Sequence, residues 1–560
     1  MWSYQNRTIR KPEGIENKRA YLIGGGIASL AAAAFLIRDA SMQGSKITIF
    51  EESTLLGGAM DGAGNAADGY IIRGGREMEE HYECCWNLFG SIPSLGDKTK
   101  TVLDEIYEIN RIDPNVSACR VLHKCGKKVL GHELGLSDVH IMELGMLLLA
   151  KEEELENISV EHYFDPSFFT TPMWLYWRSM FAFQTWHSVI EMKRYMERFI
   201  HLLPGMSKLE KILFSTYNQY DSMILPLKNY LEEQGVVFAY NTQVRDVRIE
   251  NEEGVKTARE LLLTRNEEEQ SISIGAEDLL FITNGSMTQN ATLGDMQHPA
   301  KIEKNLGSSW RLWKNIAKQD PSFGNPDIFC GAIDKTKWIS FTITCTDSPL
   351  AQILEQLTGR DPYFGKAVTG GIVTVKDSSW LLSVTCNRQP HFIAQPKNVL
   401  VLWAYGLFAD KIGDFVKKKM SECSGEELAC ELLYHLGAKE RIEEILPTLN
   451  VIPCMMPYIT SQFMPRAKGD RPKVIPDGST NFAFIGQFCE IEGECVFTVE
   501  HSVRSAISAV YGVLKIDKAI PPIYPSRYDV RVLAEATKTL YEGHSFGFES
   551  FVRTFFEDKR

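Results

Sequence analysis

Short runs of consecutive apolar residues alternate with longer stretches of helical periodicity along this chain. The first run, residues 20–23 (Ala-Tyr-Leu-Ile), predicts a buried strand, and the alanine-rich stretch 27–37 predicts a helix directly after it. Residues 46–50 predict a second strand. Later runs at 236–240, 279–286 and 482–487 predict three more strands. Strands that alternate with helices in this way favour a parallel sheet of the α/β class.

The regions between these strands show other periodicities. Residues 138–206 are mostly helical, with an apolar stripe at spacings of three and four residues made by Val189, Met192, Met196, Phe199 and Leu203. Residues 339–345 alternate between apolar and polar, which predicts a half-buried strand, and 371–376, 380–385 and 398–404 predict further strands. We therefore expect a discontinuous Rossmann-like cofactor domain, an antiparallel-β and helical substrate domain, and a helical C-terminal appendage around 528–541.

These patterns predict the following division of the chain. It begins with an N-terminal extension (1–18) and a first cofactor-domain segment (19–137), followed by a helical lid (138–210) and a second cofactor-domain segment (211–300). The substrate domain (301–470), a third cofactor-domain segment (471–515) and the C-terminal appendage (516–560) complete it.

Bulk properties narrow the classes of function. A chain of 560 residues exceeds one ordinary hydrophobic core, so we expect two to four domains. Its net charge of −12 disfavours nucleic acid and anionic membranes. The first twenty residues do not have the pattern of a signal peptide, and we expect a cytoplasmic protein. The twelve cysteines lack Cys-x-x-Cys spacing, so we expect reduced thiols and no metal site.

The C-terminal segment carries a dense group of aromatic residues: Phe546, Phe548, Phe551, Phe555 and Phe556. Such a group must bury against another surface. Packing on the parent domain or on a dimer partner is the commoner outcome, and peripheral contact with a membrane is the alternative.

The turn after the first strand carries a dinucleotide-binding pattern. Gly24 permits a tight turn, Gly26 lets the backbone approach a pyrophosphate, and Ser29 is small enough for the helix to pack on the strand. Glu51 ends the second strand, where an acidic side chain accepts hydrogen bonds from the adenosine ribose. This pattern favours FAD or NAD over NADP.

Further residues extend the predicted cofactor site. Gly57 and Gly58 form a small-residue loop after the acidic residue, which is similar to the loop beside the flavin in flavoproteins with this type of domain, and this resemblance favours FAD. The turns after two later strands add Gly285, Ser286 and Gly486.

The segment 73–78 (Arg-Gly-Gly-Arg-Glu-Met) follows this loop. Arg73 and Arg76, with Gly74 and Gly75 between them, are expected beside the flavin ring; the alternative is a surface turn whose arginines pair with Glu79 or Glu80. The segment resembles one in oleate hydratases, the FAD-containing fatty acid hydratases also called myosin-cross-reactive antigens. The resemblance continues, in the same order, through 79–86, 91–95, 180–183, 186–188, 194–196, 217–220 and 385–392.

The resemblance implies hydration of the cis-9 double bond of long-chain acids such as oleate, giving a 10-hydroxy product, with FAD organising the site and transferring no electrons. It implies that Glu77 accepts a proton from water and that Tyr195 donates one to the alkene. An isolated alkene is a poor base, so a donor must be held against one carbon and water against the other. The residues implied to bind the substrate carboxylate are Gln219, Thr385, Asn387 and His391. A homodimer is also implied.

Two alternatives remain at this stage. One is a redox flavoenzyme of the same architecture, such as a desaturase or an amine oxidase. The other is a non-catalytic flavoprotein that binds lipid or membranes. Bleaching of the flavin by substrate would favour the first, and fatty acid binding without a product would favour the second.

Overall fold

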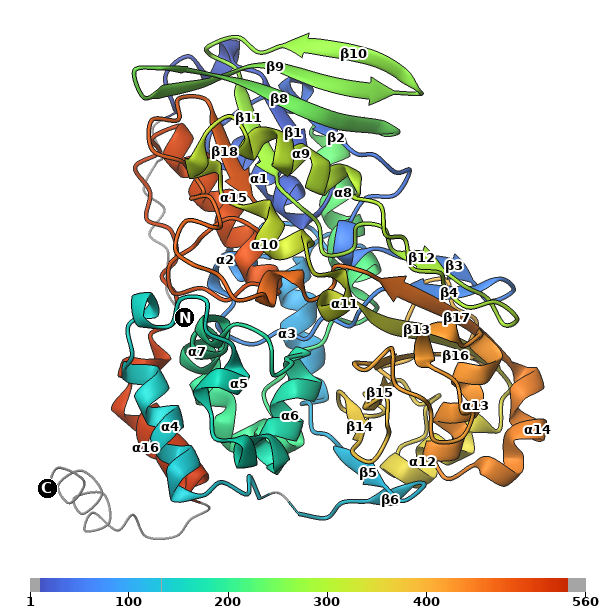
Figure 1. The fold of residues 1–560 in the computed structure, drawn as a ribbon. Helices are drawn as coiled ribbons and strands as arrows, with labels where there is room; N and C mark the ends of the chain where they lie inside the picture. The colour runs from blue at the N-terminus through green and yellow to red at the C-terminus, as the bar shows by residue number, and fades with distance from the viewer. Residues whose placement is uncertain (1–10, 132, 542–560) are drawn as a thin grey trace, which may run out of the picture.

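The computed structural model describes residues 11–131 and 133–541. Its central element is a five-stranded sheet, seen in the upper half of Figure 1. The strand order is β18 (Phe482–Ile485), β11 (Leu279–Thr283), β1 (Ala20–Ile23), β2 (Ile47–Phe50) and β7 (Val237–Ala239). Every neighbouring pair is parallel. The predicted discontinuous Rossmann-like sheet is confirmed, with strands drawn from both ends of the chain.

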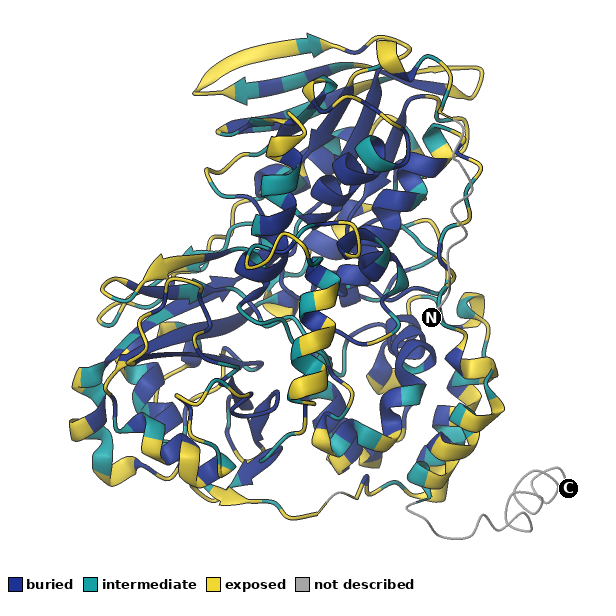
Figure 2. Ribbon diagram, turned by 180° about the vertical axis from the view of Figure 1, so that it is seen from behind, coloured by how far each residue is buried: buried dark blue, intermediate teal, exposed yellow. Residues whose placement is uncertain are grey.

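The helix that follows β1 packs closely on this sheet because the residues of its contact face have small side chains. The alanines at 31–34 in α1 (Ile27–Arg38) are all buried, and α15 (Val499–Val513) packs against that helix. These helices cover one face of the sheet, and apolar residues of β8 (Thr242–Glu252), β9 (Val255–Arg265) and α9 (Ser308–Ala317) cover the other. The strands are apolar throughout because both faces are covered, which explains the unbroken apolar runs of the sequence. Figure 2 shows the sheet and these helices as almost entirely buried.

A second sheet of eight strands forms the core of the lower right of Figure 1. Its order is β12 (Thr292–Leu293), β17 (Leu449–Met456), β13 (Trp338–Thr346), β16 (Val399–Gly406), β15 (Leu382–Thr385), β14 (Val373–Val375), β5 (Val121–His123) and β6 (Lys127–Lys128). All pairings are antiparallel except that between β14 and β5. The helices α12 (Leu350–Thr358), α13 (Gly425–His435) and α14 (Ile442–Ile445) belong to the same part of the fold.

The expectation that the strand at 339–345 is half-buried was wrong. Strand β13 is buried on both faces because the hairpin of β3 (Gly62–Asn65) and β4 (Gly69–Ile72) covers its polar side. The hydroxyl of Thr344 accepts a hydrogen bond from the Tyr70 amide at 2.9 Å, and that of Thr342 accepts one from the Ile72 amide at 3.1 Å. The alternating hydroxyls therefore accept hydrogen bonds from backbone amides of β4 instead of facing water.

A helical layer lies at the lower left of Figure 1, as the periodicity of 138–206 indicated. It contains α4 (Asp138–Leu149), α5 (Val160–Tyr163), α6 (Pro172–Phe181) and α7 (Val189–Phe199), and α16 (Val530–Leu540) packs beside it. After α7 the chain continues as a 3₁₀ helix, Ile200–Lys208.

The face of α7 opposite its apolar stripe is also buried, and ion pairs make this possible. Glu191 contacts Arg466 at 2.8 Å and Arg471 at 3.0 Å, and Arg198 contacts Glu79 at 2.9 Å. Buried charges need such partners because the interior is a poor solvent for ions.

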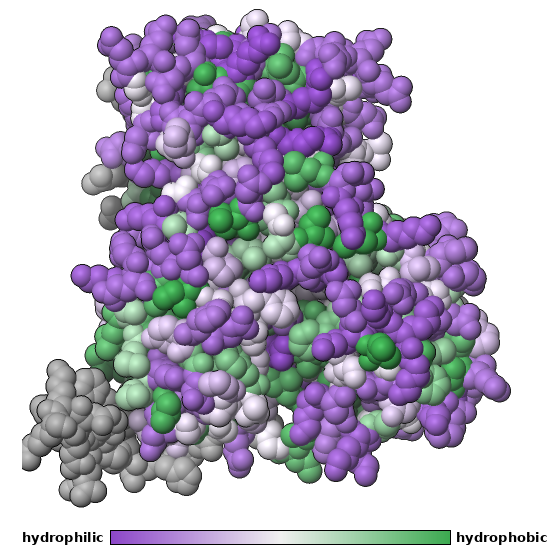
Figure 3. All heavy atoms as spheres, in the orientation of Figure 1, coloured by the Kyte–Doolittle hydropathy of each residue, from purple (hydrophilic) through white to green (hydrophobic). Residues whose placement is uncertain are grey.

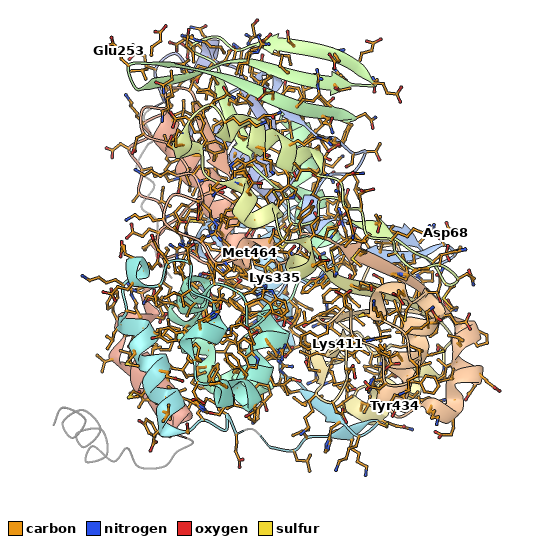
Figure 4. All side chains as sticks on the ribbon, in the orientation of Figure 1. Asp68, Glu253, Lys335, Lys411, Tyr434 and Met464 are labelled. Atoms are coloured by element: carbon orange, nitrogen blue, oxygen red, sulfur yellow. The ribbon has the colours of Figure 1, made fainter. Side chains whose placement is uncertain are left out.

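Two features depart from the division expected of the chain. Strands β5 and β6 fall inside the first predicted cofactor segment but extend the eight-stranded sheet. Strands β8 (Thr242–Glu252), β9 (Val255–Arg265) and β10 (Glu268–Ser273) form a separate antiparallel sheet within 211–300. Figure 3 shows a mainly polar surface over this sheet at the top of the molecule, and Figure 4 places Glu253 at its outer turn, far from Tyr434 on α13. The domain boundaries stay a prediction.

The remaining α-helices connect the elements described above. They are α2 (Glu83–Phe89), α3 (Val102–Ile112), α8 (Leu225–Glu233), α9 (Ser308–Ala317), α10 (Pro326–Cys330) and α11 (Ile333–Thr336). Helix α2 begins only at Glu83, after a turn in which the carboxylate of Glu79 accepts a hydrogen bond from the His81 amide at 2.7 Å.

Ten of the twelve cysteines are buried, and none is in a disulfide. Across residues 11–131 and 133–541, we find no helix with both the length and the apolar character needed to cross a bilayer. The C-terminal phenylalanines discussed above lie outside the described residues.

Candidate functional site

The turn between β1 and α1 forms one wall of a cavity of about 390 Å³, the cofactor cavity. Gly24 has a left-handed φ of 87°, which favours glycine, and Gly26 precedes the helix with no side chain capping it. A Cβ atom at Gly26 would meet nothing within 4 Å, so the backbone is open on that side. The free N–H groups and the positive end of the helix dipole can hold a phosphate there.

Ten of the thirteen predicted cofactor-binding residues line this cavity: Gly24, Gly26, Glu51, Gly57, Gly58, Arg73, Arg76, Gly285, Ser286 and Gly486. Ser29 does not, because it faces the sheet, where its hydroxyl lies 3.4 Å from the Ile23 carbonyl oxygen. Gly74 and Gly75 line the next cavity instead.

The acidic residue at the end of β2 also shapes the glycine turn. One carboxylate oxygen of Glu51 accepts the Gly25 amide at 2.8 Å, and the other accepts the Ser53 amide at 2.8 Å. A Cβ atom at Gly25 would lie 2.5 Å from the end of the Leu56 side chain and 2.8 Å from a carboxylate oxygen of Glu51, so a larger residue would displace these two side chains. The open turn, the uncapped helix and this carboxylate fit a dinucleotide such as FAD.

The two arginines of segment 73–78 have different partners. Arg73 forms an ion pair with Asp61 and donates to the Gly58 carbonyl at 3.1 Å. Arg76 donates only to the carbonyls of Gly75 and Ala59 and has no carboxylate partner among the described residues. Burial lowers the pKa of Arg76 to about 10, which leaves it cationic at neutral pH. Its charge favours an anionic group in the cavity beside it.

A second cavity of about 120 Å³, the reaction cavity, adjoins the first. Glu77, Tyr195, Thr385 and Asn387, which come from three distant parts of the chain, all line it. The two cavities share a wall made by Arg76, Phe497, Thr498 and Val499. The helix α15 begins in this wall, so its positive end lies at both cavities.

Glu77 has the environment expected of a general base near neutral pH. Its carboxylate makes no hydrogen bond or ion pair within the described structure, and one of its oxygens would lie 3.4 Å from a Cβ atom built on Gly371. Burial raises the pKa of Glu77 to about 7, and the positive charge of Arg120 opposes this shift. Arg120 is held by the Thr374 and Ser179 hydroxyls at 3.1 and 2.9 Å.

Tyr195 projects from α7 and is almost completely buried, at 2% exposure. Its hydroxyl donates to the Val496 carbonyl at 2.6 Å, and its ring packs edge-on against Phe181 and Phe183. Burial raises the pKa of Tyr195 well above its ordinary value, so the phenol keeps its proton.

Two of the four predicted carboxylate-binding residues line the reaction cavity. The Thr385 hydroxyl donates to the Asn387 amide oxygen at 3.1 Å. The Asn387 amide nitrogen makes no hydrogen bond within the described structure, so it is available to a ligand. Because the amide oxygen of Asn387 is occupied by Thr385, the amide N–H groups of Asn387 can donate to a carboxylate.

The other two, Gln219 and His391, lie behind this cavity. The Gln219 amide donates to the carbonyl of Gly74 at 3.0 Å, and Gly74 lines the cavity. The His391 carbonyl accepts the Asn218 amide at 2.8 Å, which places His391 next to Gln219. Burial lowers the pKa of His391 to about 4, so the imidazole is neutral. The side chains of these two residues do not line the cavity in this structure.

A third, apolar cavity of about 430 Å³ adjoins the reaction cavity on the other side. The two share Met180, Phe181, Phe199, Leu202 and Ile212. The outer walls of the apolar cavity come from α4, α6, the Ile200–Lys208 helix and α16, whose Ala536 is buried against it. The cavity at the glycine turn, the small cavity with an acid and a phenol, and the apolar cavity therefore lie in series.

Sequence reasoning missed several contributors to this site. Phe497, Thr498 and Val499 had only a weak signal, a threonine in front of the last long helix pattern. Arg120 had none, because its contacts to residues 176, 179, 372 and 374 are distant in sequence. One group in the described residues, Asp414, Glu431 and His435, has the proximity to hold a metal ion, but it belongs to none of these cavities. That the site needs no metal stays a prediction.

The fold and these cavities define an α/β protein with a glycine turn of the dinucleotide-binding type and an adjoining apolar compartment. Residues 17–511 match the MCRA family, and the chain belongs to it. It is 44% identical to an oleate hydratase from Streptococcus pyogenes serotype M49 (strain NZ131), over 94% of this chain and 90% of the relative. It is 31% identical to a linoleate hydratase from Lactiplantibacillus plantarum, over 94% of this chain and 98% of the relative. The predicted membership is confirmed.

A solved structure of an oxidoreductase from Methanosarcina mazei is similar at a TM-score of 0.49, with 13% identity, and the match covers 88% of this chain and 99% of that one.

Proposed function

We propose that the protein is an FAD-containing fatty acid hydratase that adds water across the cis-9 double bond of long-chain acids such as oleate. The observation that carries the proposal is that Glu77, Tyr195, Thr385 and Asn387 line one small cavity between a dinucleotide cavity and an apolar cavity. The two hydratase relatives support this reaction class.

The substrate chain would occupy both the reaction cavity and the apolar cavity. Asn387 and Thr385 would bind the carboxylate, with Gln219 and His391 completing that end after a small rearrangement. The apolar cavity would hold the methyl-terminal half of the chain, because burying each CH₂ group contributes about 0.8 kcal/mol. The double bond would then lie near Glu77 and Tyr195.

The chemistry follows from the protonation states of this pair. At neutral pH a large fraction of Glu77 is ionised, since its pKa is about 7, while Tyr195 is protonated. Glu77 accepts a proton as a water O–H bond breaks, and the oxygen of that water bonds to C10. The Tyr195 proton bonds to C9. Because the phenol is a weak acid, this transfer must accompany the attack of water, and the proton on Glu77 must afterwards be returned to Tyr195.

The cofactor would be held by Gly24, Gly26, Glu51, Gly57 and Gly58, with its ring near Arg76. When bound, FAD would supply the shape and charge of one wall of the reaction cavity and would exchange no electrons with the substrate. The positive charge of Arg76 would favour the anionic, reduced form. We also expect a homodimer and a cytoplasmic location, and these expectations rest on the family resemblance and on the sequence.

The proposal is tested by anaerobic incubation of the protein with FAD and oleate in water labelled with heavy oxygen. We expect a hydroxy acid that carries one labelled oxygen. A product without the label, or turnover that requires an electron acceptor, would instead support a redox flavoenzyme. Glu77→Gln should retain bound FAD and lose turnover, and Ser53→Ala, on the adenosine side of the cofactor cavity, should retain turnover at saturating FAD.

A further inference from the structure

Most of the wall between the cofactor cavity and the reaction cavity belongs to one short segment, residues 494–499. Phe497, Thr498 and Val499 of this segment line both cavities. The carbonyl of Val496 accepts the hydroxyl of Tyr195 at 2.6 Å. The position of the phenol oxygen therefore depends on a backbone carbonyl that is carried by the wall of the cofactor cavity.

Gln487 holds this segment from the cofactor side. Its amide oxygen accepts the backbone N–H of Phe497, and its amide nitrogen donates to the Thr498 carbonyl and the Ser502 hydroxyl, each at 2.8 Å. Phe497 has a φ of 71°, a left-handed conformation that is costly for a residue with a large side chain. Such a conformation persists only where surrounding contacts enforce it. Gln487 supplies such contacts through its hydrogen bonds to the backbone of Phe497 and Thr498.

The helix that carries Tyr195 holds the segment from the other side. Arg194 donates to the carbonyls of Ile491 and Glu494 at 3.2 and 3.4 Å. Arg198 contacts the Glu494 carboxylate at 3.2 Å. These two arginines flank Tyr195 on α7, so one end of the segment is fixed to the helix. The turn at Phe497 is then the part whose shape decides where the Val496 carbonyl points.

We infer that Gln487 is a positioning residue for Tyr195, acting through the Phe497 turn and the Val496 carbonyl. This inference rests on the proposed function of Tyr195 as proton donor. It also gives the cofactor cavity a physical connection to the donor, because Gln487 lines that cavity while its amide fixes the turn. A displacement of the Gln487 side chain would therefore shift the Phe497 turn and the Val496 carbonyl, and with them the hydroxyl of Tyr195.

Gln487→Leu tests the inference, because leucine keeps most of the volume and removes all three hydrogen bonds. With FAD saturating, we expect kcat for oleate to fall about 10- to 100-fold, the effect of misplacing a catalytic group by about 1 Å. We expect KM to change by less than about threefold, because no substrate-binding side chain is altered.

A double-mutant cycle separates positioning from general damage. In the Tyr195→Phe background there is no hydroxyl to position, so Gln487→Leu should change the residual rate by less than about twofold. Gln319→Leu is the matched control: Gln319 also bonds two backbone groups, the Val247 carbonyl and the Ile249 amide, but on β8. We expect it to leave kcat unchanged.

A crystal structure of the Gln487→Leu variant supplies a readout that does not depend on turnover. We expect the Tyr195 hydroxyl to lie beyond 3.5 Å from the Val496 carbonyl, outside hydrogen-bonding distance. An unchanged distance, or fully additive effects in the cycle, would overturn the inference alone. An unchanged rate in Tyr195→Phe would instead overturn the proton-donor role on which it depends.

Discussion

Replacing Glu77 by glutamine should make the protein more stable in alkaline solution. Burial raises the pKa of Glu77 from 4.5 to about 7. The difference is about 2.5 pKa units, and at 1.36 kcal/mol per unit the ionised side chain destabilises the fold by about 3 kcal/mol. A glutamine has a similar shape and cannot ionise, so it avoids this cost.

The sign of the pH dependence follows from the raised pKa. Below pH 4.5 the carboxyl is protonated in both the folded and the unfolded chain, and it costs nothing. Between pH 4.5 and 7 the unfolded chain loses its proton first, so stability falls as the pH rises, and the loss is complete above pH 7. The gain from Glu77→Gln should therefore be about 3 kcal/mol at pH 8.5 and less than about 1 kcal/mol at pH 5.

The assay compares thermal unfolding midpoints of the two proteins at pH 5 and pH 8.5, with FAD bound and with FAD removed. We expect the variant to be higher by a few degrees at pH 8.5 and nearly equal at pH 5. Glu253→Gln, at the exposed outer turn of the β8–β9 hairpin (Figure 4), should give no pH-dependent difference. The same gain at both pH values for Glu77→Gln would refute the reasoning, because the cost would then not come from ionisation.

Three further predictions concern other walls of the site. Asn387→Ala should raise KM for oleate about 10- to 100-fold and leave KM for its methyl ester unchanged, since a hydrogen bond to a charged group contributes about 1.5–3 kcal/mol; equal effects on acid and ester would contradict carboxylate binding. Arg76→Met should lower the midpoint potential of bound FAD, measured by spectroelectrochemical titration, because the unpaired cation favours the anionic reduced form; an unchanged potential would exclude that role. Ala536→Trp should reduce kcat/KM for an 18-carbon acid more than for a 14-carbon acid, and equal losses would show that the apolar cavity does not hold the chain end.

The parts of the fold that depend on local pattern could be predicted from the sequence. The strands of the parallel sheet are apolar throughout because both faces are covered, and the glycine turn is specified by residues adjacent in the chain. The two-residue alternation at 339–345 was misleading because the groups that contact its polar residues are distant in the sequence. Hydroxyls at those positions satisfy a hairpin more than 250 residues away, and nothing in a single sequence records that partner.

The candidate site shows the same division. Arg76 and Glu77 lie in one short segment after the glycine loop, so a position near the cofactor cavity could be expected, whereas the role of Glu77 was implied only by the family resemblance. The role of residues 494–499 could not, since a left-handed phenylalanine and a backbone carbonyl leave no trace in residue type. Gln219 and His391 carry a sequence signal, but their side chains lie behind the cavity that Thr385 and Asn387 line. Residue type alone therefore did not show which of the four residues line the cavity.

The order of strands in the five-stranded sheet has a consequence for biosynthesis. Strand β18 begins at residue 482 and pairs with β11, and α15, which packs on α1, ends at residue 513. A ribosome must therefore translate as far as residue 513 before the glycine turn near residue 24 acquires all of these neighbours. Contacts this distant in sequence form slowly. The cavity beside this turn is also lined by Gly486 and by residues 497–499, so it can be complete only after these late residues have been translated.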